Sequence, residues 1–152
     1  MPNRTYHEEQ EIKNIKLLRN ILSEMPQYVT TFFRSIKYSK SPRTRLGYAR
    51  DLKSFYEYLC DTNKSLQGKT TKDISIDIID QITSEDIEEY LEHLKVYQKN
   101  GREFTNGERA IKRKLMSLRV FMSYLYKNKK ISGNPAIIVD TPKIHDKAII
   151  RM

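Results

Sequence analysis

Apolar residues recur at helical spacing along most of the chain, and this pattern predicts a bundle of amphipathic helices. A first helix is expected from about Glu8 to just before Pro26, because proline interrupts a continuing helix. A second, shorter helix follows it. The expected inward residues are Ile12, Ile15, Leu18 and Leu22 in the first helix and Val29, Phe32, Phe33 and Ile36 in the second.

The third predicted helix starts with a strong boundary signal. Ser41 can cap its N-terminus, and Pro42 suits the first turn, where its missing N–H has no helical partner to lose. The helix is expected to continue to about Asp61. Its predicted core face consists of Thr44, Tyr48, Leu52, Phe55 and Leu59. The nearly opposite face carries Arg43, Gly47, Arg50 and Ser54.

The middle of the chain has weaker patterns. A polar connector leads to the stretch ISIDIIDQI, which we interpret as a short helical turn or a packed loop, because a lone strand would have no partner. Thr83 and Asp86 form a capping box that opens the next helix. Residues 97–104 are interpreted as a loop, and Thr105 with Glu108 as a second capping box.

The last long helix is expected from residue 106 to 128, and it ends before Gly133 and Pro135. Its predicted core face consists of Ile111, Leu115, Leu118, Met122 and Leu125. The opposite face carries Arg109, Arg113, Ser117 and Val120, with Lys112 on the flank. The residues after this helix are interpreted as an extended linker interrupted by prolines.

Charge changes this picture because it is strong and unevenly distributed. The 152 residues include 28 Lys and Arg against 19 Asp and Glu, which gives a net charge of +9. Cations dominate residues 33–54 and 95–130, whereas residues 69–94 hold eight carboxylates and two lysines. A surface of one sign is unfavourable unless a partner neutralises it, so nucleic acid is the favoured partner.

Other functional classes have little support in the sequence. No apolar run is long enough to span a membrane, and the N-terminus lacks the apolar core of a signal peptide, so we expect a soluble, cytoplasmic protein. Cys60 is expected to be a small buried thiol. The histidines are scattered, and Asp73, Asp77 and Asp80 lack the glycine and glutamate of a calcium loop. We therefore predict no metal, no cofactor and no small-molecule substrate.

Several stretches of the chain resemble, in order, the N-terminal core-binding region of tyrosine recombinases, a family of phage and mobile-element integrases and Xer-type enzymes. They are SPRTRLGYARDLKSFYEYL, ITSEDIEEYLEHL, IKRKLMSLRVFMSYLYKNKKISGNPA and VDTPK, and the resemblance covers roughly residues 26–145. It implies an all-α fold, a four-helix SAM-like bundle that forms half of a clamp around duplex DNA. The helices that lie against the major groove in that family match residues 42–60 and 106–128 here.

The resemblance and the two arginine rows together give a predicted DNA-binding set and a division of the chain. Arginine forks suit phosphate oxygens and guanine edges, and small residues such as Gly47 and Ser117 let a groove wall approach. The predicted DNA-contacting residues are Ser41, Arg43, Thr44, Arg45, Gly47, Arg50, Arg109, Lys112, Arg113, Ser117 and Arg119. The predicted division is an N-terminal helical extension at 1–25, a core-binding domain at 26–135 and a linker at 136–152.

The resemblance also implies a function that this chain does not carry alone. Catalysis in the family uses a C-terminal domain with two arginines, a lysine, histidines and a tyrosine that attacks the scissile phosphate, and no such series precedes Met152. We therefore expect a non-catalytic piece of a larger integrase. Its expected partners are double-stranded DNA and other protomers of the recombinase on DNA, without a membrane.

Two other classes stay open at this point. One is a protein-interaction module whose basic faces meet acidic surfaces, and the helix before Pro26 suits that role. The other is a free-standing helical regulator or an RNA-binding protein. A regulator would show a compact helix-turn-helix, and none of the connectors is that short. An RNA reader would expose aromatic rings for stacking, whereas Tyr48, Tyr56 and Tyr126 are expected inward and Tyr124 alone outward.

Overall fold

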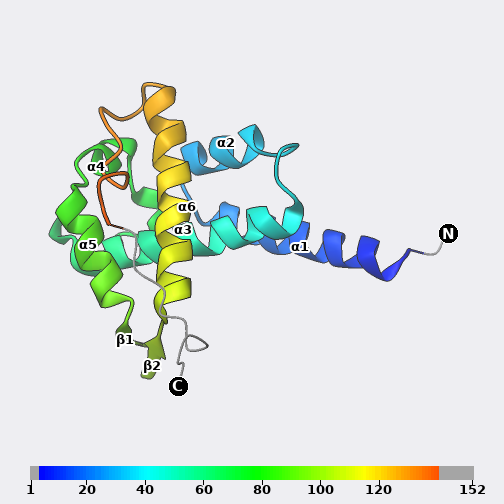
Figure 1. Ribbon diagram of the computed structural model, residues 1–152, viewed down its shortest axis with the longest axis horizontal. Helices are drawn as coiled ribbons and strands as arrows, with labels where there is room; N and C mark the ends of the chain where they lie inside the picture. The colour runs from blue at the N-terminus through cyan, green and yellow to red at the C-terminus, as the bar shows by residue number, and fades with distance from the viewer. Residues whose placement is uncertain (1–3, 141–152) are drawn as a thin grey trace, which may run out of the picture.

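The computed structural model describes residues 4–140, and its elements are arranged around two long crossing helices (Figure 1). The helices are α1 (Tyr6–Ser23), α2 (Gln27–Ser35), α3 (Pro42–Thr62), α4 (Ile76–Asp80), α5 (Ser84–His93) and α6 (Glu108–Lys127). The remaining elements are two 3₁₀ turns, η1 (Lys64–Leu66) and η2 (Thr71–Asp73), and two strands, β1 (Val96–Lys99) and β2 (Arg102–Thr105). The predicted helical class is confirmed, with one hairpin added to it.

Capping side chains mark the starts of α1, α3 and α5. Ser41 caps α3 as predicted, because its hydroxyl accepts a hydrogen bond from the backbone N–H three residues further on. Thr83 and Asp86 form the predicted capping box of α5. The second predicted box is wrong, since Thr105 ends β2 and Gly107 precedes α6 without a side-chain cap. The isoleucine-rich stretch contains a short helical turn, α4, as interpreted from the sequence.

The strands β1 and β2 form an antiparallel hairpin where the sequence predicted a loop. Its tip residues, Asn100 and Gly101, have φ angles of 52° and 75°. A two-residue turn with positive φ at both positions follows the twist of the flanking strands and strongly favours Asn-Gly. The hairpin signal was therefore present in the sequence, and the loop interpretation of residues 97–104 is wrong.

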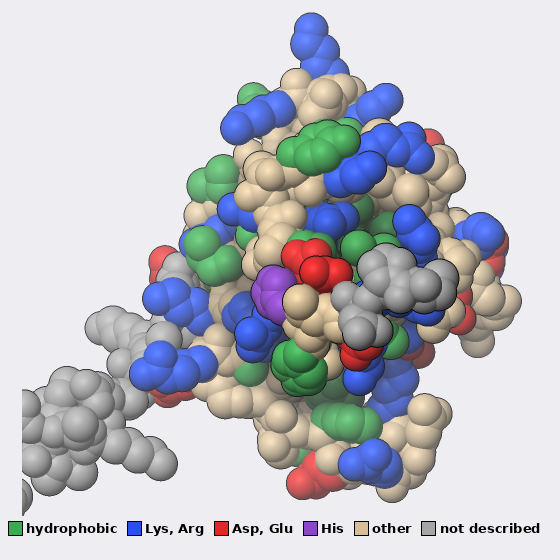
Figure 2. Space-filling model, turned by 90° about the vertical axis from the view of Figure 1, so that its right-hand side faces the viewer, with side chains coloured by type: hydrophobic (Ala, Val, Ile, Leu, Met, Phe, Trp, Pro, Cys, Tyr) green, Lys and Arg blue, Asp and Glu red, His purple; other side chains and the backbone are tan. Residues whose placement is uncertain are grey.

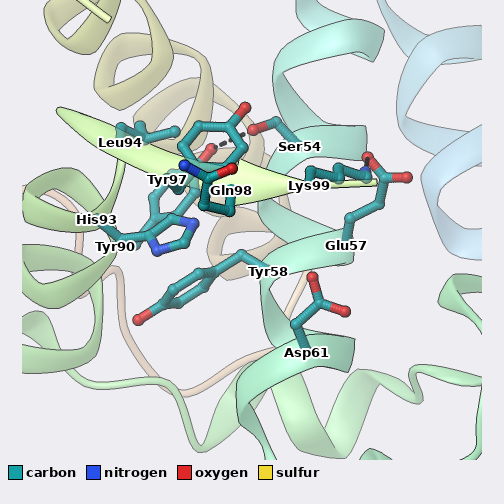
Figure 3. Close-up of a pocket in the computed structure, with 10 residues that line it drawn as sticks. All are labelled: Ser54, Glu57, Tyr58, Asp61, Tyr90, His93, Leu94, Tyr97, Gln98 and Lys99. Atoms are coloured by element: carbon teal, nitrogen blue, oxygen red, sulfur yellow. Dashed lines mark hydrogen bonds and ion pairs between the residues drawn. The ribbon is translucent and has the colours of Figure 1, made fainter. Parts of the chain in front are cut away.

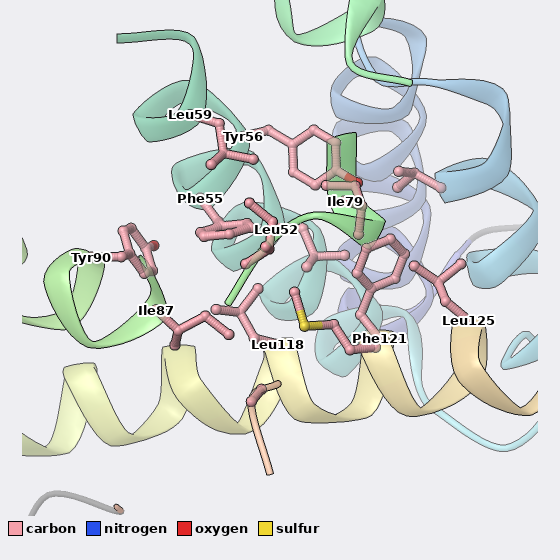
Figure 4. Packing of buried hydrophobic residues seen from close by; sticks show 14 of the residues in the cluster. Leu52, Phe55, Tyr56, Leu59, Ile79, Ile87, Tyr90, Leu118, Phe121 and Leu125 are labelled. Carbon is pink, nitrogen blue, oxygen red and sulfur yellow. The ribbon is translucent and has the colours of Figure 1, made fainter. Parts of the chain in front are cut away.

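The hydrophobic core lies where α3 and α6 cross, and α4 and α5 close it on one side (Figure 4). Its labelled members in Figure 4 are Leu52, Phe55, Tyr56, Leu59, Ile79, Ile87, Tyr90, Leu118, Phe121 and Leu125. The five inward residues predicted for the last helix are all buried. Aromatic rings of the neighbouring helices pack against this crossing. The ring centroids of Phe32 and Phe121 are 5.2 Å apart, and those of Phe55 and Tyr90 are 5.0 Å apart. Close packing of this kind holds the outward faces of α3 and α6 in one relative position.

The buried face of α3 differs from the predicted one in its first half. Thr44 is exposed and Tyr48 half-buried, whereas Leu46 and Ala49 are buried. The reason is α1, which packs along α3 and shifts the covered face toward itself. Beyond Asp51 the predicted core positions are correct.

Two tyrosines of α6 have the opposite orientation from the predicted one. Tyr124 is half-buried, and its ring centroid lies 5.3 Å from that of Phe32 on α2. Tyr126, which was expected inward, is exposed. The helix α2 was expected to pack in the bundle, but the face of α6 that it covers could not be read from periodicity alone.

The segment after α6 packs against the domain as far as the structure describes it. Ile131, Ala136 and Val139 are buried, although residues from 136 onward were predicted to form a linker. Residues 141–152 of that predicted linker lie outside the described residues. Each helix described within residues 4–140 is too short or too polar to span a bilayer.

Candidate nucleic-acid interface

The outward sides of α3 and α6 carry the arginines that the sequence singled out. Arg43 and Arg50 on α3 and Arg109 on α6 are exposed, and Lys112 beside Arg109 is half-buried. Within residues 4–140, these three arginines make no side-chain hydrogen bond or ion pair. Figure 2, seen from the side where the N-terminus lies, shows Lys and Arg side chains spread over the surface. A guanidinium group without an internal partner can bind a phosphate oxygen without first breaking an internal contact.

A shallow groove runs beside the arginine row of α3. Its volume is about 670 Å³, and Arg43, Gly47 and Arg50 line one wall. The other wall is the first half of α1, with polar side chains that include Gln10 and Asn14. Sequence reasoning missed this wall because it placed α1 outside the DNA-binding domain. The polar character of α1 was visible in the sequence, but its position beside α3 was not.

Gly47 is not required by the packing of the protein itself. A Cβ atom built at Gly47 would meet no atom within 4 Å, and this glycine lies inside a helix, where alanine is preferred by about 1 kcal/mol. The space next to Gly47 is therefore open in the structure.

A buried carboxylate joins the two helices at their crossing. Asp51 of α3 is 2% exposed, and it accepts hydrogen bonds from three residues of α6. Arg113 donates from Nη2 to Oδ1 at 2.9 Å and from Nε to Oδ2 at 3.3 Å. Lys114 Nζ lies 3.3 Å from Oδ1, and Ser117 Oγ lies 2.7 Å from Oδ2. A buried charge needs partners of this kind, and Asp51 has all of them on one neighbouring helix.

This cluster corrects the prediction for Ser117 and refines the one for Arg113. Ser117 is buried and donates to Asp51, so it does not lie on an outward face. It lies at the edge of the α6 core face that meets α3. The side chain of Arg113 is 61% exposed although its inner edge is bonded to Asp51. Arg113 therefore belongs both to the helix crossing and to the surface.

Arg119 also lies apart from the predicted surface. It donates from Nε to the carbonyl of Ala136 at 2.9 Å and from Nη2 to the carbonyl of Val139. In addition, the side-chain amide of Asn134 donates to the Arg119 carbonyl at 3.2 Å. These bonds hold the segment after α6 against that helix, which is a structural role on a different side from Arg109 and Arg113.

The remaining predicted residues lie near the start of α3 and do not form one surface. Ser41 and Thr44 are exposed, and their hydroxyls are 3.1 Å apart at the helix cap. Arg45 donates from Nε to the carbonyl of Lys40 at 3.2 Å. It lines a second groove, between α1, α2 and α3, rather than the groove beside Arg43. The eleven predicted residues are thus distributed over several sides of α3 and α6.

A small hollow between α3, α5 and the hairpin has a volume of about 40 Å³ and is lined by paired groups (Figure 3). Lys99 forms an ion pair of 2.8 Å with Glu57, and the Tyr90 hydroxyl donates to Ser54 at 2.9 Å. Burial raises the pKa of Tyr90, so this phenol stays protonated and can donate. The hollow has room for water alone, and Ser54 at its edge is occupied by Tyr90.

Metal-binding and nucleophilic residues are not brought together in the described part of the chain. Among residues 4–140, no three His, Cys, Asp or Glu side chains are placed to hold a metal ion. Cys60 is half-buried, and burial raises the pKa of its thiol, with nearby carboxylates adding to the effect. A thiol with a raised pKa is a poor nucleophile.

Comparison with known proteins finds similarity over most of the chain. Residues 29–129 match the family model described as phage integrase, N-terminal SAM-like domain. The chain is 38% identical over 121 residues to tyrosine recombinase XerC of Caldanaerobacter subterraneus subsp. tengcongensis. That match covers 74% of the chain and 32% of the relative, so the chain spans about a third of the relative's length. No solved structure matches the chain.

Proposed function

The chain belongs to the phage-integrase N-terminal SAM-like domains of tyrosine recombinases, and from this membership we propose that it grips duplex DNA with α3 and α6. The observation that carries the proposal is the pair of crossing helices with unpaired outward arginines, Arg43 and Arg50 on one and Arg109 on the other. Packing where α3 and α6 cross fixes the backbone positions of these arginines relative to one another. A duplex can therefore be contacted by both helices without rearrangement of the fold.

The wider role that we propose follows from the family. The domain is a DNA-binding core-binding domain of a site-specific recombinase, and its parent protein is the enzyme that exchanges DNA strands. In this proposal residues 26–135 form the core-binding domain, residues 1–25 an N-terminal extension, and residues 136–152 a connection toward a catalytic domain. The proposed partners are double-stranded DNA and other protomers bound to the same DNA.

The direct test of DNA binding is its dependence on salt. If about five phosphates are neutralised, log K falls with log salt at a slope of about −4.5, which is a loss of roughly 500-fold between 50 and 200 mM salt. Fluorescence anisotropy of a labelled duplex measures this slope. A flat salt dependence would contradict duplex DNA as the main partner.

A second test concerns chemistry. Incubated with a nicked suicide recombination substrate, the chain is expected to form no covalent protein–DNA adduct on a denaturing gel. An adduct would mean that one of its own tyrosines attacks DNA, and the assignment of these residues to a non-catalytic domain would be wrong.

A protein-contact function is favoured by one separate feature, the groove between α1, α2 and α3. Apolar residues that include Ile15 and Phe33 lie at its base, and all its charged residues are cations: Arg19, Arg34, Lys37 and Arg45. An apolar base with a cationic rim suits an acidic, partly apolar surface of another protein, such as a neighbouring protomer. Reversal of Arg34 to Glu is expected to weaken assembly of protomers on DNA in gel-shift titrations and to leave binding of a single protomer unchanged.

A further inference from the structure

The buried carboxylate at the helix crossing has a consequence for recognition, and it rests on the proposed DNA-binding function. We propose that Asp51 is a positioning residue that fixes the guanidinium of Arg113, so that the outer edge of Arg113 contacts a guanine base in the major groove. Asp51 itself does not touch DNA, because it is 2% exposed.

The hydrogen bonds leave a defined part of Arg113 available. A guanidinium carries five N–H donors, and Asp51 takes one from Nε and one from Nη2. The three remaining donors are the two on Nη1 and the second one on Nη2, at the end of the side chain remote from Asp51. Two of them can bond side by side to the O6 and N7 acceptors of guanine, which is the commonest specific arginine contact with DNA.

The Asp51 carboxylate, which is the anchor for Arg113, is held in place by two further residues of α6. Both carboxylate oxygens of Asp51 accept two hydrogen bonds, because Ser117 shares Oδ2 and Lys114 shares Oδ1 with Arg113. The side chain of Lys114 is 12% exposed, so this lysine supports the anchor from inside the fold. The cluster contains two cations and one carboxylate, and its remaining positive charge suits a DNA-facing position.

The other outward arginines have no such support. Arg43, Arg50 and Arg109 make no side-chain hydrogen bond or ion pair in the described part of the chain. A mobile guanidinium can follow a phosphate over a range of positions, but discrimination between bases needs donors in a fixed place. Arg113 is 61% exposed and bonded through two nitrogens to a buried carboxylate, so it meets the requirement for base readout.

The experiment starts with the whole chain and a pool of random-sequence duplexes. Selection is expected to enrich guanine at one or more positions, and replacement of that guanine with 7-deazaguanine, which lacks the N7 acceptor, is expected to weaken binding roughly tenfold. The same measurement on Asp51→Asn is expected to show no penalty for 7-deazaguanine. Its affinity for unselected DNA should be equal or higher, because the variant has lost a negative charge.

Matched variants separate positioning from stability. Arg119→Ala removes hydrogen bonds to the Ala136 and Val139 carbonyls, away from Asp51, and it is expected to lower the melting temperature without changing the 7-deazaguanine penalty. Arg113→Ala removes every donor of this side chain and is expected to abolish the penalty, and Asp51→Asn combined with Arg113→Ala should have no further effect on it. If Asp51→Asn does not fold, Ser117→Ala tests the same anchor with the charge retained, and a reduced penalty is expected.

The outcomes distinguish this inference from the proposed function. A wild-type chain that binds no duplex overturns the proposed function and the inference together. A wild-type chain that binds duplexes but shows no 7-deazaguanine penalty at any enriched position overturns the inference alone. So does an Asp51→Asn variant that keeps the full penalty or weakens all duplexes alike.

Discussion

Arg50 of α3 and Arg113 of α6 lie on the two helices that cross at the centre of the fold, and they differ in what holds them. Arg50 is exposed, and within residues 4–140 it has no side-chain hydrogen bond or ion pair. Arg113 is bonded through two nitrogens to the buried carboxylate of Asp51. Charge on a helix face and the fixing of that charge are thus separate properties, the first suited to affinity and the second to specificity.

The largest effect is expected from Arg113→Glu, which changes the arginine that is bonded to Asp51. The change removes the bidentate partner of a buried carboxylate and places a second negative charge beside it. Loss of one partner of a buried ion pair costs about 3–5 kcal/mol, and the lower end applies here because Lys114 and Ser117 remain bonded to Asp51. Urea denaturation measures this loss of unfolding free energy, and DNA affinity should fall as well.

The matched change at the arginine without a side-chain partner in the described residues is Arg50→Glu. Substitutions at exposed positions without partners usually stay within about 0.5 kcal/mol of the wild-type stability. Loss of a charge-assisted contact with DNA costs about 1.5–3 kcal/mol, so binding is expected to weaken by at least about tenfold. If the two reversals change the stability equally, Arg113 is not held by Asp51 in the way the structure shows.

The sequence predicted the outward position of the free arginines, but for Arg113 it did not predict the bond to Asp51. Helical periodicity placed Arg43, Arg50 and Arg109 away from the core, because an outward position depends only on spacing within one helix. It could not show that Asp51 is buried, since the burial of this residue depends on which side of α3 is covered by α6. The available signal was the spacing of Asp51, which follows Tyr48 by three residues and precedes Phe55 by four, so it shares a helix side with two predicted core residues.

Arg119→Ala is expected to have the next largest effect, and it tests an arginine that is fixed but turned away from the proposed DNA surface. Its guanidinium satisfies the carbonyls of Ala136 and Val139, and a buried acceptor that loses its partner costs about 1–3 kcal/mol. Thermal melting should show this loss, while the salt slope of DNA binding stays unchanged. A slope that becomes shallower by about one would place Arg119 on a phosphate instead.

Three errors in the sequence predictions have a common physical cause, contacts between elements that no single element encodes. Thr44 was expected inside, but α1 covers the neighbouring face of α3, and Ser117 was expected outside but meets Asp51. The inward and outward tyrosines of α6 were exchanged because α2 packs over Tyr124. The hairpin is a different case, because the Asn-Gly turn signal was present and was given too little weight.

Gly47→Ala is expected to have a smaller effect of the opposite sign on stability. Alanine is favoured over glycine inside a helix by about 1 kcal/mol, and the added Cβ meets no atom within 4 Å. The variant should therefore unfold at higher urea concentration. If DNA approaches the backbone between Arg43 and Arg50, its affinity for duplexes should fall at the same time. Increased stability with unchanged affinity for duplexes would contradict a close approach of DNA to the backbone at Gly47.

The smallest effect is expected from Glu88→Lys on α5, which decides whether the free arginines act locally or only through net charge. Glu88 is exposed on the acidic helix and belongs to the surface that we expect to face away from DNA. The reversal changes the net charge by two, as Arg50→Glu does in the other direction. At 0.15 M salt the screening length is about 8 Å, so a distant charge adds little to binding. If the DNA affinity of Glu88→Lys stays within about twofold of wild type while that of Arg50→Glu falls, the free arginines act through local contacts. An increase as large as the Arg50→Glu decrease would show that net charge governs binding, and the arginine rows would then have no specific role.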